Sequence, residues 1–105
     1  MMTTLAAAAN SMRGNLTGGD RIFDGISIDT RTLRTGELFV ALQGPNFDGR
    51  DYVLQASEKG AAAAVVAAIV DDNIAQITVD DTRLALGQLG AAWRRDQSAV
   101  VVGIT

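Results

Sequence analysis

The sequence predicts an α/β fold: one layered domain in which a mixed, mainly parallel β-sheet is flanked by helices. Short apolar runs of strand length alternate along the chain with segments of helical pattern, which is typical of layered α/β domains. The length of 105 residues matches a single domain. Hydrophobic residues make up 48% of the chain and charged residues 20%, so the apolar content suffices for a core.

Three segments are expected to form helices. Residues 3–14 begin with two threonines that can cap a helix, continue with alanines of high helix propensity, and reach a glycine that suits a helix end. Residues 51–60 likewise run from an aspartate cap to a glycine stop. The third helix begins within Asp80–Thr82 and extends to about Asp96, with acidic residues near its positive end.

The third helix carries an apolar stripe. Leu86, Leu89 and Trp93 fall on one helical face, which predicts that this face packs into the core. Gly87 and Gly90 interrupt the helix, and each should cost about 1 kcal/mol relative to alanine. We interpret these glycines as a sign of close packing against another element.

The first strands are expected near the middle of the amino-terminal half. Ile22, Ile26 and Ile28 supply alternating β-branched residues around Asp24-Gly25, a dipeptide that strongly favours a two-residue hairpin turn. Two short antiparallel strands are therefore predicted here, which would make the sheet mixed.

Further strands are expected at three apolar runs. Residues 38–42 form a continuous apolar run that predicts a strand buried on both faces. Residues 43–50, which hold the only proline of the chain, are interpreted as a loop. Residues 61–68 favour a buried strand, although a continued helix is an alternative, and residues 74–79 predict another short strand.

Composition excludes several kinds of site. The chain has no cysteine and no histidine, which removes disulfides, thiolate metal sites and the commonest general base. Its 9 basic and 12 acidic residues give a net charge of −3, with no basic run suited to nucleic acid. Neither a GxxxxGK[ST] phosphate loop nor a GxGxxG motif is present. We therefore expect no catalytic residue and no metal ligand in this chain, but a binding or interaction role.

Two clusters are candidates for that role. Ser27-Ile28-Asp29-Thr30-Arg31 places a hydroxyl, a carboxylate and a guanidinium where a strand enters a loop. Thr30 and Arg31 could donate to a phosphate or sugar oxygen. Alternatively, Asp29 and Thr30 could bond to the backbone of the turn while Arg31 pairs with a carboxylate. In the loop that follows the buried strand, Asn46 could bind a base edge and Phe47 could stack on a ring, or Phe47 could fill the core.

Taken together, these segments resemble the amino-terminal domain of the Mur ligase family, most closely its branch that adds D-alanyl-D-alanine. Four blocks carry the resemblance, in this order: Ser27-Ile28-Asp29-Thr30-Arg31; Gly36-Glu37-Leu38-Phe39-Val40-Ala41-Leu42-Gln43-Gly44; Asn46-Phe47-Asp48-Gly49-Arg50-Asp51-Tyr52; Asp81-Thr82-Arg83-Leu84-Ala85-Leu86-Gly87-Gln88-Leu89. The resemblance covers most of the chain from about Ile26 onward.

The resemblance implies what this chain binds and what kind of full-length enzyme it would belong to. Residues 1–98 would form an amino-terminal domain that binds the UDP end of UDP-N-acetylmuramoyl-tripeptide in peptidoglycan precursor synthesis. Residues 99–105 would be the first strand of a central ATP-binding domain. The full-length enzyme would be a bacterial, cytoplasmic, ATP-dependent amide-forming ligase that uses Mg²⁺ and D-alanyl-D-alanine through later domains. We expect a monomer that neither binds nucleic acid nor enters a membrane, and that binds no cofactor in this fragment.

The resemblance also implies roles for individual residues. Ile28 would line the uracil pocket, and Thr30 would bond the phosphate region of the nucleotide. Pro45, Asn46 and Phe47 match the uracil-contacting loop of the family. Further candidates for contact with the UDP moiety are the neighbouring residues Ser27, Asp29 and Arg31.

Two alternatives stay open. The chain could be the amino-terminal domain of the sister ligase that adds the third amino acid, although that enzyme usually has a His-Gln-Ala type sequence at residues 45–47. A histidine common in the D-alanyl-D-alanine branch is replaced here by Arg50. The other alternative is a non-catalytic ligand-binding or interaction module with the same fold.

Overall fold

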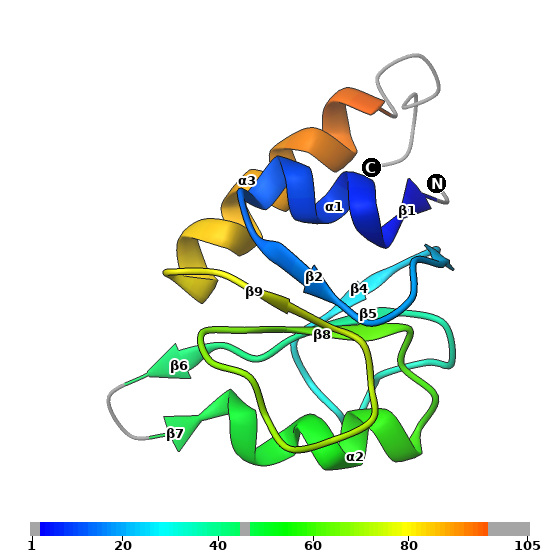
Figure 1. The fold of residues 1–105 in the computed structure, drawn as a ribbon, viewed down its shortest axis with the longest axis vertical. Helices are drawn as coiled ribbons and strands as arrows, with labels where there is room; N and C mark the ends of the chain where they lie inside the picture. Colours follow the sequence, from blue (N-terminus) through cyan, green and yellow to red (C-terminus); the bar gives the residue numbers. More distant parts are fainter. Residues whose placement is uncertain (1–2, 45–46, 97–105) are drawn as a thin grey trace.

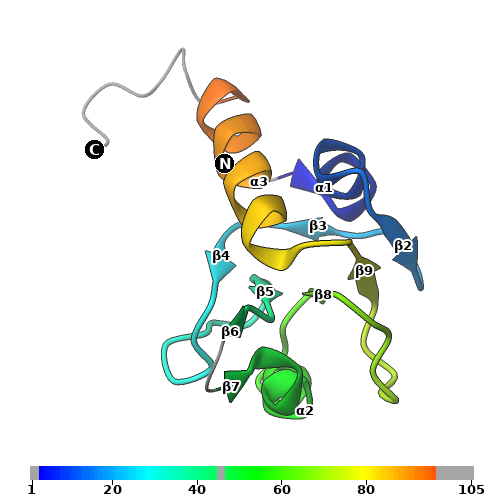
Figure 2. The same cartoon turned by 90° about the vertical axis from the view of Figure 1, so that its left-hand side faces the viewer.

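The chain folds into three layers, with helices on both sides of a central sheet. The computed structural model describes residues 3–44 and 47–96, so the strand expected at residues 99–105 lies outside the described residues. One face of the sheet is covered by α1 (Leu5–Met12) and α3 (Thr82–Asp96), and the other by α2 (Val53–Glu58) (Figure 1). A view turned by 90° shows the same separation of α2 from the other two helices (Figure 2).

The central sheet has five strands in the order β2-β9-β8-β5-β4. All neighbouring pairs are parallel except the pair of β2 with β9, which is antiparallel. The expectation of a mixed, mainly parallel sheet with flanking helices is therefore confirmed. The strands span the following residues: β2, Asn15–Thr17; β4, Ile26–Ser27; β5, Leu38–Val40; β8, Ala63–Val66; β9, Gln76–Thr78.

Two small antiparallel sheets lie outside the central one. In the first, β1 (Thr3–Thr4) pairs with β3 (Ile22–Phe23). In the second, β6 (Gln43–Gly44) pairs with β7 (Phe47–Asp48). The interpretation of residues 43–50 as a loop is therefore wrong. They include a short hairpin, followed by a 3₁₀ turn at Gly49–Tyr52.

The hairpin predicted at Asp24-Gly25 is also wrong. The strands on either side of this dipeptide belong to different sheets, since β3 pairs with β1 and β4 pairs with β5. The glycine is explained by a long-range approach. A Cβ atom on Gly25 would lie 2.6 Å from Oε2 of Glu37, and the Gly25 carbonyl accepts a hydrogen bond of 2.8 Å from the Leu38 N–H.

Side-chain caps determine where α1 begins. The Thr4 hydroxyl oxygen accepts a hydrogen bond of 3.2 Å from a first-turn N–H, and Asp20 accepts another of 2.9 Å. These bonds satisfy donors that have no partner within the helix. The last residue of the helix is Met12, and the capping residue Arg13 takes the left-handed conformation with φ 56°, one residue before the predicted end at Gly14. Gly14 instead allows a close approach to β9.

The expected start of α3 is confirmed, but the close packing expected of its glycines is wrong at Gly87. One carboxylate oxygen of Asp81 accepts hydrogen bonds from the N–H groups of Arg83 and Leu84. Leu89 is buried, as its place in the stripe predicts. Gly87 is exposed, and a Cβ atom there would meet no atom within 4 Å. The side chain of Trp93 lies outside the described residues.

Successive side chains along the central strands point to opposite faces of the sheet, so the hydrophobic core has two parts. Leu38 and Val40 pack with α1 and α3, whereas Phe39 packs with the residues of α2. The run at 61–68, for which a strand and a helix were both open, contains the buried strand β8. Over the described part of the chain, no helix has the length and apolar character needed to cross a membrane.

Replacing Gly87 by alanine is expected to raise the free energy of unfolding by about 1 kcal/mol, because alanine is the better helix former and the added methyl group meets open space. Urea denaturation of wild type and Gly87→Ala measures the difference. Gly14→Ala serves as the contrasting variant: its Cβ would lie 2.7 Å from the Ile77 side chain, so it should destabilise the fold. A loss of stability in Gly87→Ala would contradict the open environment of this position.

Candidate ligand-binding site

A pocket of about 590 Å³ opens beside the ends of two parallel strands. Residues 28–31 follow β4 directly, and Leu42 lies just beyond the end of β5. Ligands of open α/β sheets bind outside the carboxyl ends of the strands, and this volume is in the range of small-molecule sites. The lining residues are Ile28, Asp29, Thr30, Arg31, Phe39, Leu42, Tyr52 and Gln55.

Apolar and aromatic side chains form much of the wall. Phe39 is buried beneath the pocket, and Leu42 is half-buried. Ile28 and Tyr52 are unusually exposed for large hydrophobic residues, at 53% and 43%. Their exposure at a concave surface leaves apolar area available to a ring.

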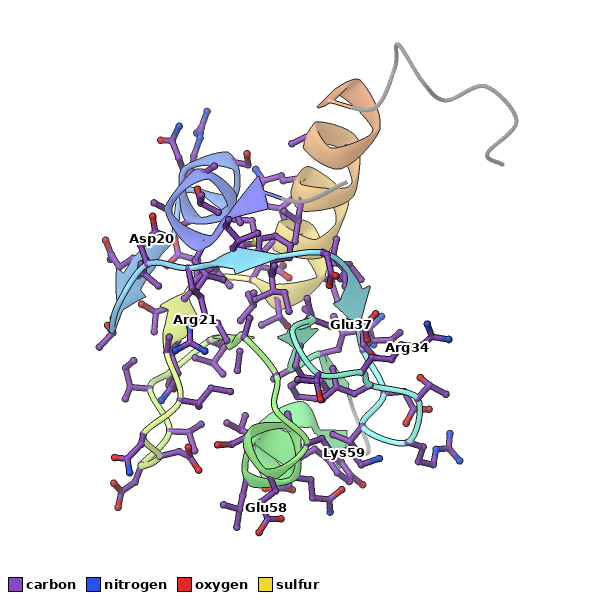
Figure 3. All side chains as sticks on the ribbon, turned by 90° about the vertical axis from the view of Figure 1, so that its right-hand side faces the viewer. Asp20, Arg21, Arg34, Glu37, Glu58 and Lys59 are labelled. Atoms are coloured by element: carbon purple, nitrogen blue, oxygen red, sulfur yellow. The ribbon has the colours of Figure 1, made fainter. Side chains whose placement is uncertain are left out.

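The polar centre of the pocket is Thr30, which is only 6% exposed. Its hydroxyl donates a hydrogen bond of 3.1 Å to Oε1 of Gln55, and its backbone carbonyl accepts one from the Lys59 ammonium group. Gln55 lies in α2 and Lys59 follows that helix directly, so one helix holds Thr30 at two atoms. Figure 3 shows Lys59 at the end of α2, beside the loop that follows β4.

Asp29 and Arg31 form an ion pair at the mouth of the pocket, with an N–O distance of 2.8 Å. The Arg31 guanidinium and the Arg31 backbone N–H both donate to the Asp29 carboxylate, which lowers the pKa of that group to about 2. The same pairing raises the pKa of Arg31. The Arg31 side chain is 87% exposed, so part of its guanidinium faces solvent.

Ser27 shapes the turn rather than the pocket wall. Its hydroxyl accepts a hydrogen bond of 3.2 Å from the Asp29 N–H and donates one of 3.0 Å to the Asp29 carbonyl. These bonds, together with the Asp29–Arg31 pair, correspond to the local turn and ion-pair roles considered from the sequence. Thr30 differs, because its hydroxyl bonds to a distant helix instead of the turn.

The structure gathers part of the sequence-predicted site. Ile28, Asp29, Thr30 and Arg31 line one pocket, and Ser27 lies just behind them. Pro45 and Asn46 lie outside the described residues, as does the side chain of Phe47, so their predicted roles stay predictions.

Sequence reasoning missed the contribution of α2 and its flanks. Tyr52 and Gln55 line the pocket, and Lys59 holds Thr30 from behind. A usable signal was present, because these residues follow the first loop after a buried strand and recur at spacings of three and four. That spacing indicates one helical face next to the strand ends.

The model of the Mur ligase family, catalytic domain, matches residues 22–94. The chain belongs to the Mur ligase family. It is 45% identical over 103 residues to the UDP-N-acetylmuramoyl-tripeptide–D-alanyl-D-alanine ligase of Escherichia coli, which covers 97% of this chain and 23% of that ligase. It is 40% identical over 82 residues to a UDP-N-acetylmuramoyl-L-alanyl-D-glutamate–2,6-diaminopimelate ligase of Bacillus licheniformis, covering 76% and 17% of the two chains.

Solved structures agree with the fold of this Mur ligase family member. A crystal structure of MurF from Acinetobacter baumannii superimposes with a TM-score of 0.83 at 36% identity. The match covers 94% of this chain and 22% of that one. The chain therefore spans about a quarter or less of the relatives and structures it matches.

The Asp29 carboxyl group is expected to titrate near pH 2 in wild type, and in Arg31→Gln its pKa should rise towards about 3.9. Because the pKa of Asp29 is lower in the folded than in the unfolded chain, its ion pair stabilises the fold fully at pH values above the unfolded pKa. This stabilisation is lost as the pH falls through the folded pKa of about 2. Carboxyl carbon NMR shifts followed against pH measure the change. Arg34→Gln is the matched control, and an equal shift there would contradict the assigned pair.

Proposed function

We propose that this chain binds the UDP end of UDP-N-acetylmuramoyl-tripeptide as the amino-terminal domain of an ATP-dependent ligase that adds D-alanyl-D-alanine. The observation that carries the proposal is the pocket at the ends of β4 and β5, where four residues of the resembling Ser27–Arg31 block come together. Membership of the Mur ligase family, and the name of the Escherichia coli relative, support the choice of ligand.

The chemistry of the pocket suits a uridine nucleotide. Ile28 and Tyr52 offer apolar area for the base, and the wall continues into buried Phe39. Thr30 lines the pocket, where its hydroxyl donates to Gln55, and the exposed guanidinium of Arg31 stands at the mouth. An arginine pairs well with phosphate oxygens, which places the diphosphate on the solvent side of the base. Pro45, Asn46 and Phe47 remain part of the proposed site as uracil contacts.

In this proposal, chemistry belongs to the rest of the protein. The described residues hold no group of three or more aspartates, glutamates, histidines or cysteines placed to bind a metal ion. No phosphate loop occurs in the 105 residues. ATP and Mg²⁺ would therefore be bound by further domains, with residues 99–105 as the first strand of the central one. Binding energy at the UDP end would then position the distant carboxylate for reaction.

The sister ligase is the second candidate function, supported by the relative from Bacillus licheniformis. The two ligases share the UDP end of their substrates, so this pocket alone does not separate them. The third candidate is a non-catalytic module, and the sequence of the gene distinguishes it from the two ligases. A reading frame that continues into Gly-x-x-Gly-Lys-Thr supports the ligase, and one that continues without any phosphate loop supports the module.

An NMR titration of the chain with UDP-N-acetylmuramoyl-tripeptide is expected to shift the amide signals of Ile28, Thr30 and their neighbours in a saturable way. ATP is the control ligand and should leave these signals unchanged. Thr30→Ala should weaken binding about tenfold, the effect of one lost hydrogen bond of just over 1 kcal/mol, while the fold is kept. A folded wild-type chain that shows no shifts with the sugar nucleotide would contradict the proposal.

A further inference from the structure

Thr30 is hydrogen-bonded at both its hydroxyl and its carbonyl. Two side chains from one face of α2 and its end meet it, although they lie 25 and 29 residues further along the chain. Gln55 binds the hydroxyl, and Lys59 binds the carbonyl of the same residue. The two are four residues apart, so they lie on the same side of α2 and of the residue that follows it.

We propose that Gln55 and Lys59 are positioning residues that hold the Thr30 hydroxyl in the orientation in which it meets the ligand. This inference rests on the proposed nucleotide-binding function. Gln55 also lines the pocket, whereas Lys59 is not part of the lining; in the positioning role, each acts on the ligand through Thr30. A hydroxyl already held in one rotamer loses less conformational entropy on binding, so its hydrogen bond contributes more to affinity.

The surroundings of Thr30 fit a positioning role. The loop that carries it is bonded to the end of α2 at two further points: the Thr35 hydroxyl donates to the Lys59 carbonyl at 3.1 Å, and the Gly36 N–H donates to the Gly60 carbonyl at 2.8 Å. The backbone of the loop is therefore held in place without the Thr30 hydroxyl. The bond from that hydroxyl to Gln55 orients the side chain in particular.

Glutamine also has a chemical advantage at this position. Its amide accepts the hydroxyl proton through Oε1 in the structure, and its NH₂ group can donate if the amide turns over. Thr30 can then donate its hydroxyl hydrogen bond to a phosphate or sugar oxygen of the ligand, while the Gln55 NH₂ group donates to the Thr30 hydroxyl oxygen. Glutamate keeps only the accepting function, and methionine has no donor and only a weak sulfur acceptor.

The test separates orientation from ligand binding. The χ1 rotamer of Thr30 is measured first, by three-bond couplings in the ligand-free chain, for wild type, Gln55→Met, Gln55→Glu and Glu58→Gln. Glu58 lies on the exposed outer side of α2 and is the matched control (Figure 3). We expect one rotamer in wild type, Gln55→Glu and Glu58→Gln, and averaged rotamers in Gln55→Met. Unchanged couplings in Gln55→Met would overturn the proposal.

Binding is then measured with UMP by calorimetry on a double-mutant cycle. Gln55→Met should weaken UMP binding about fivefold in wild type and by less than about twofold when Thr30 is already valine. An equal loss on both backgrounds would show that Gln55 contacts the ligand itself and would overturn the positioning role. If wild type binds neither UMP nor the sugar nucleotide, the proposed function fails, whereas the rotamer measurement still decides whether Gln55 orients Thr30.

Lys59 is tested without ligand, because its charge could act on a phosphate directly. Lys59→Met should speed amide hydrogen exchange in residues 30–32 by about fivefold, the effect of losing one hydrogen bond of about 1 kcal/mol. Lys59→Arg keeps a donor and should stay near the wild-type rates. Equal exchange rates in wild type and Lys59→Met would remove Lys59 from the proposal.

Discussion

The arrangement of the site depends on how the loop between β4 and β5 is attached to α2. Parallel neighbouring strands are usually joined by a helix, but residues 28–37 join these two without one. The polar backbone of such a loop needs partners from elsewhere. The end of α2 supplies them: Lys59 bonds to the loop through both its ammonium group and its carbonyl, and Gly60 accepts from Gly36.

A hydrophobic anchor accompanies these bonds. Leu33, in the middle of the loop, is buried in the cluster that also contains Val53 and Ala56 of α2. Gly60 then turns the chain away from the helix with a φ of 86°, a conformation that side chains rarely adopt. As a result, the chain can enter β8 beside β5 while the loop stays packed on the helix. The pocket is the space left between this loop, the end of β5 and the start of α2.

Sequence patterns correctly predicted the elements that depend on neighbouring residues. They gave wrong predictions where contacts between distant residues determine the structure. The apolar runs at 38–42 and 61–68 predicted the central strands because burial on both faces leaves a direct trace in composition. Asp24-Gly25 misled because the same dipeptide that favours a turn also permits the close approach of Glu37, a contact that no short-range rule contains. At Gly87 the error was the opposite one: close packing was predicted, but the residue is exposed.

In the candidate site, too, the residues that are adjacent in sequence were predicted and those brought in by long-range contacts were not. The residues after β4 are adjacent in sequence, so one motif predicted all of Ile28 to Arg31, whereas Gln55 and Lys59 reach Thr30 only through the fold. The uracil contacts of Pro45, Asn46 and Phe47 were inferred from the resemblance, and they stay predictions. A helical spacing beside a strand end could have indicated Tyr52 and Gln55, but not which loop atom each would meet.

In the proposed function the ligand is an anionic diphosphate, and the charges of the chain indicate where affinity for it would arise. The chain has a net charge of −3, so its overall field does not attract a diphosphate. At the mouth of the pocket, Asp29 stays ionised at neutral pH because its pKa is about 2, and it offsets most of the Arg31 charge. Arg31 can then offer directional N–H groups but little net charge. In the proposed function, affinity would therefore come mainly from contact with the apolar wall and from hydrogen bonds inside the pocket, so the orientation of the Thr30 hydroxyl would have a larger effect on affinity.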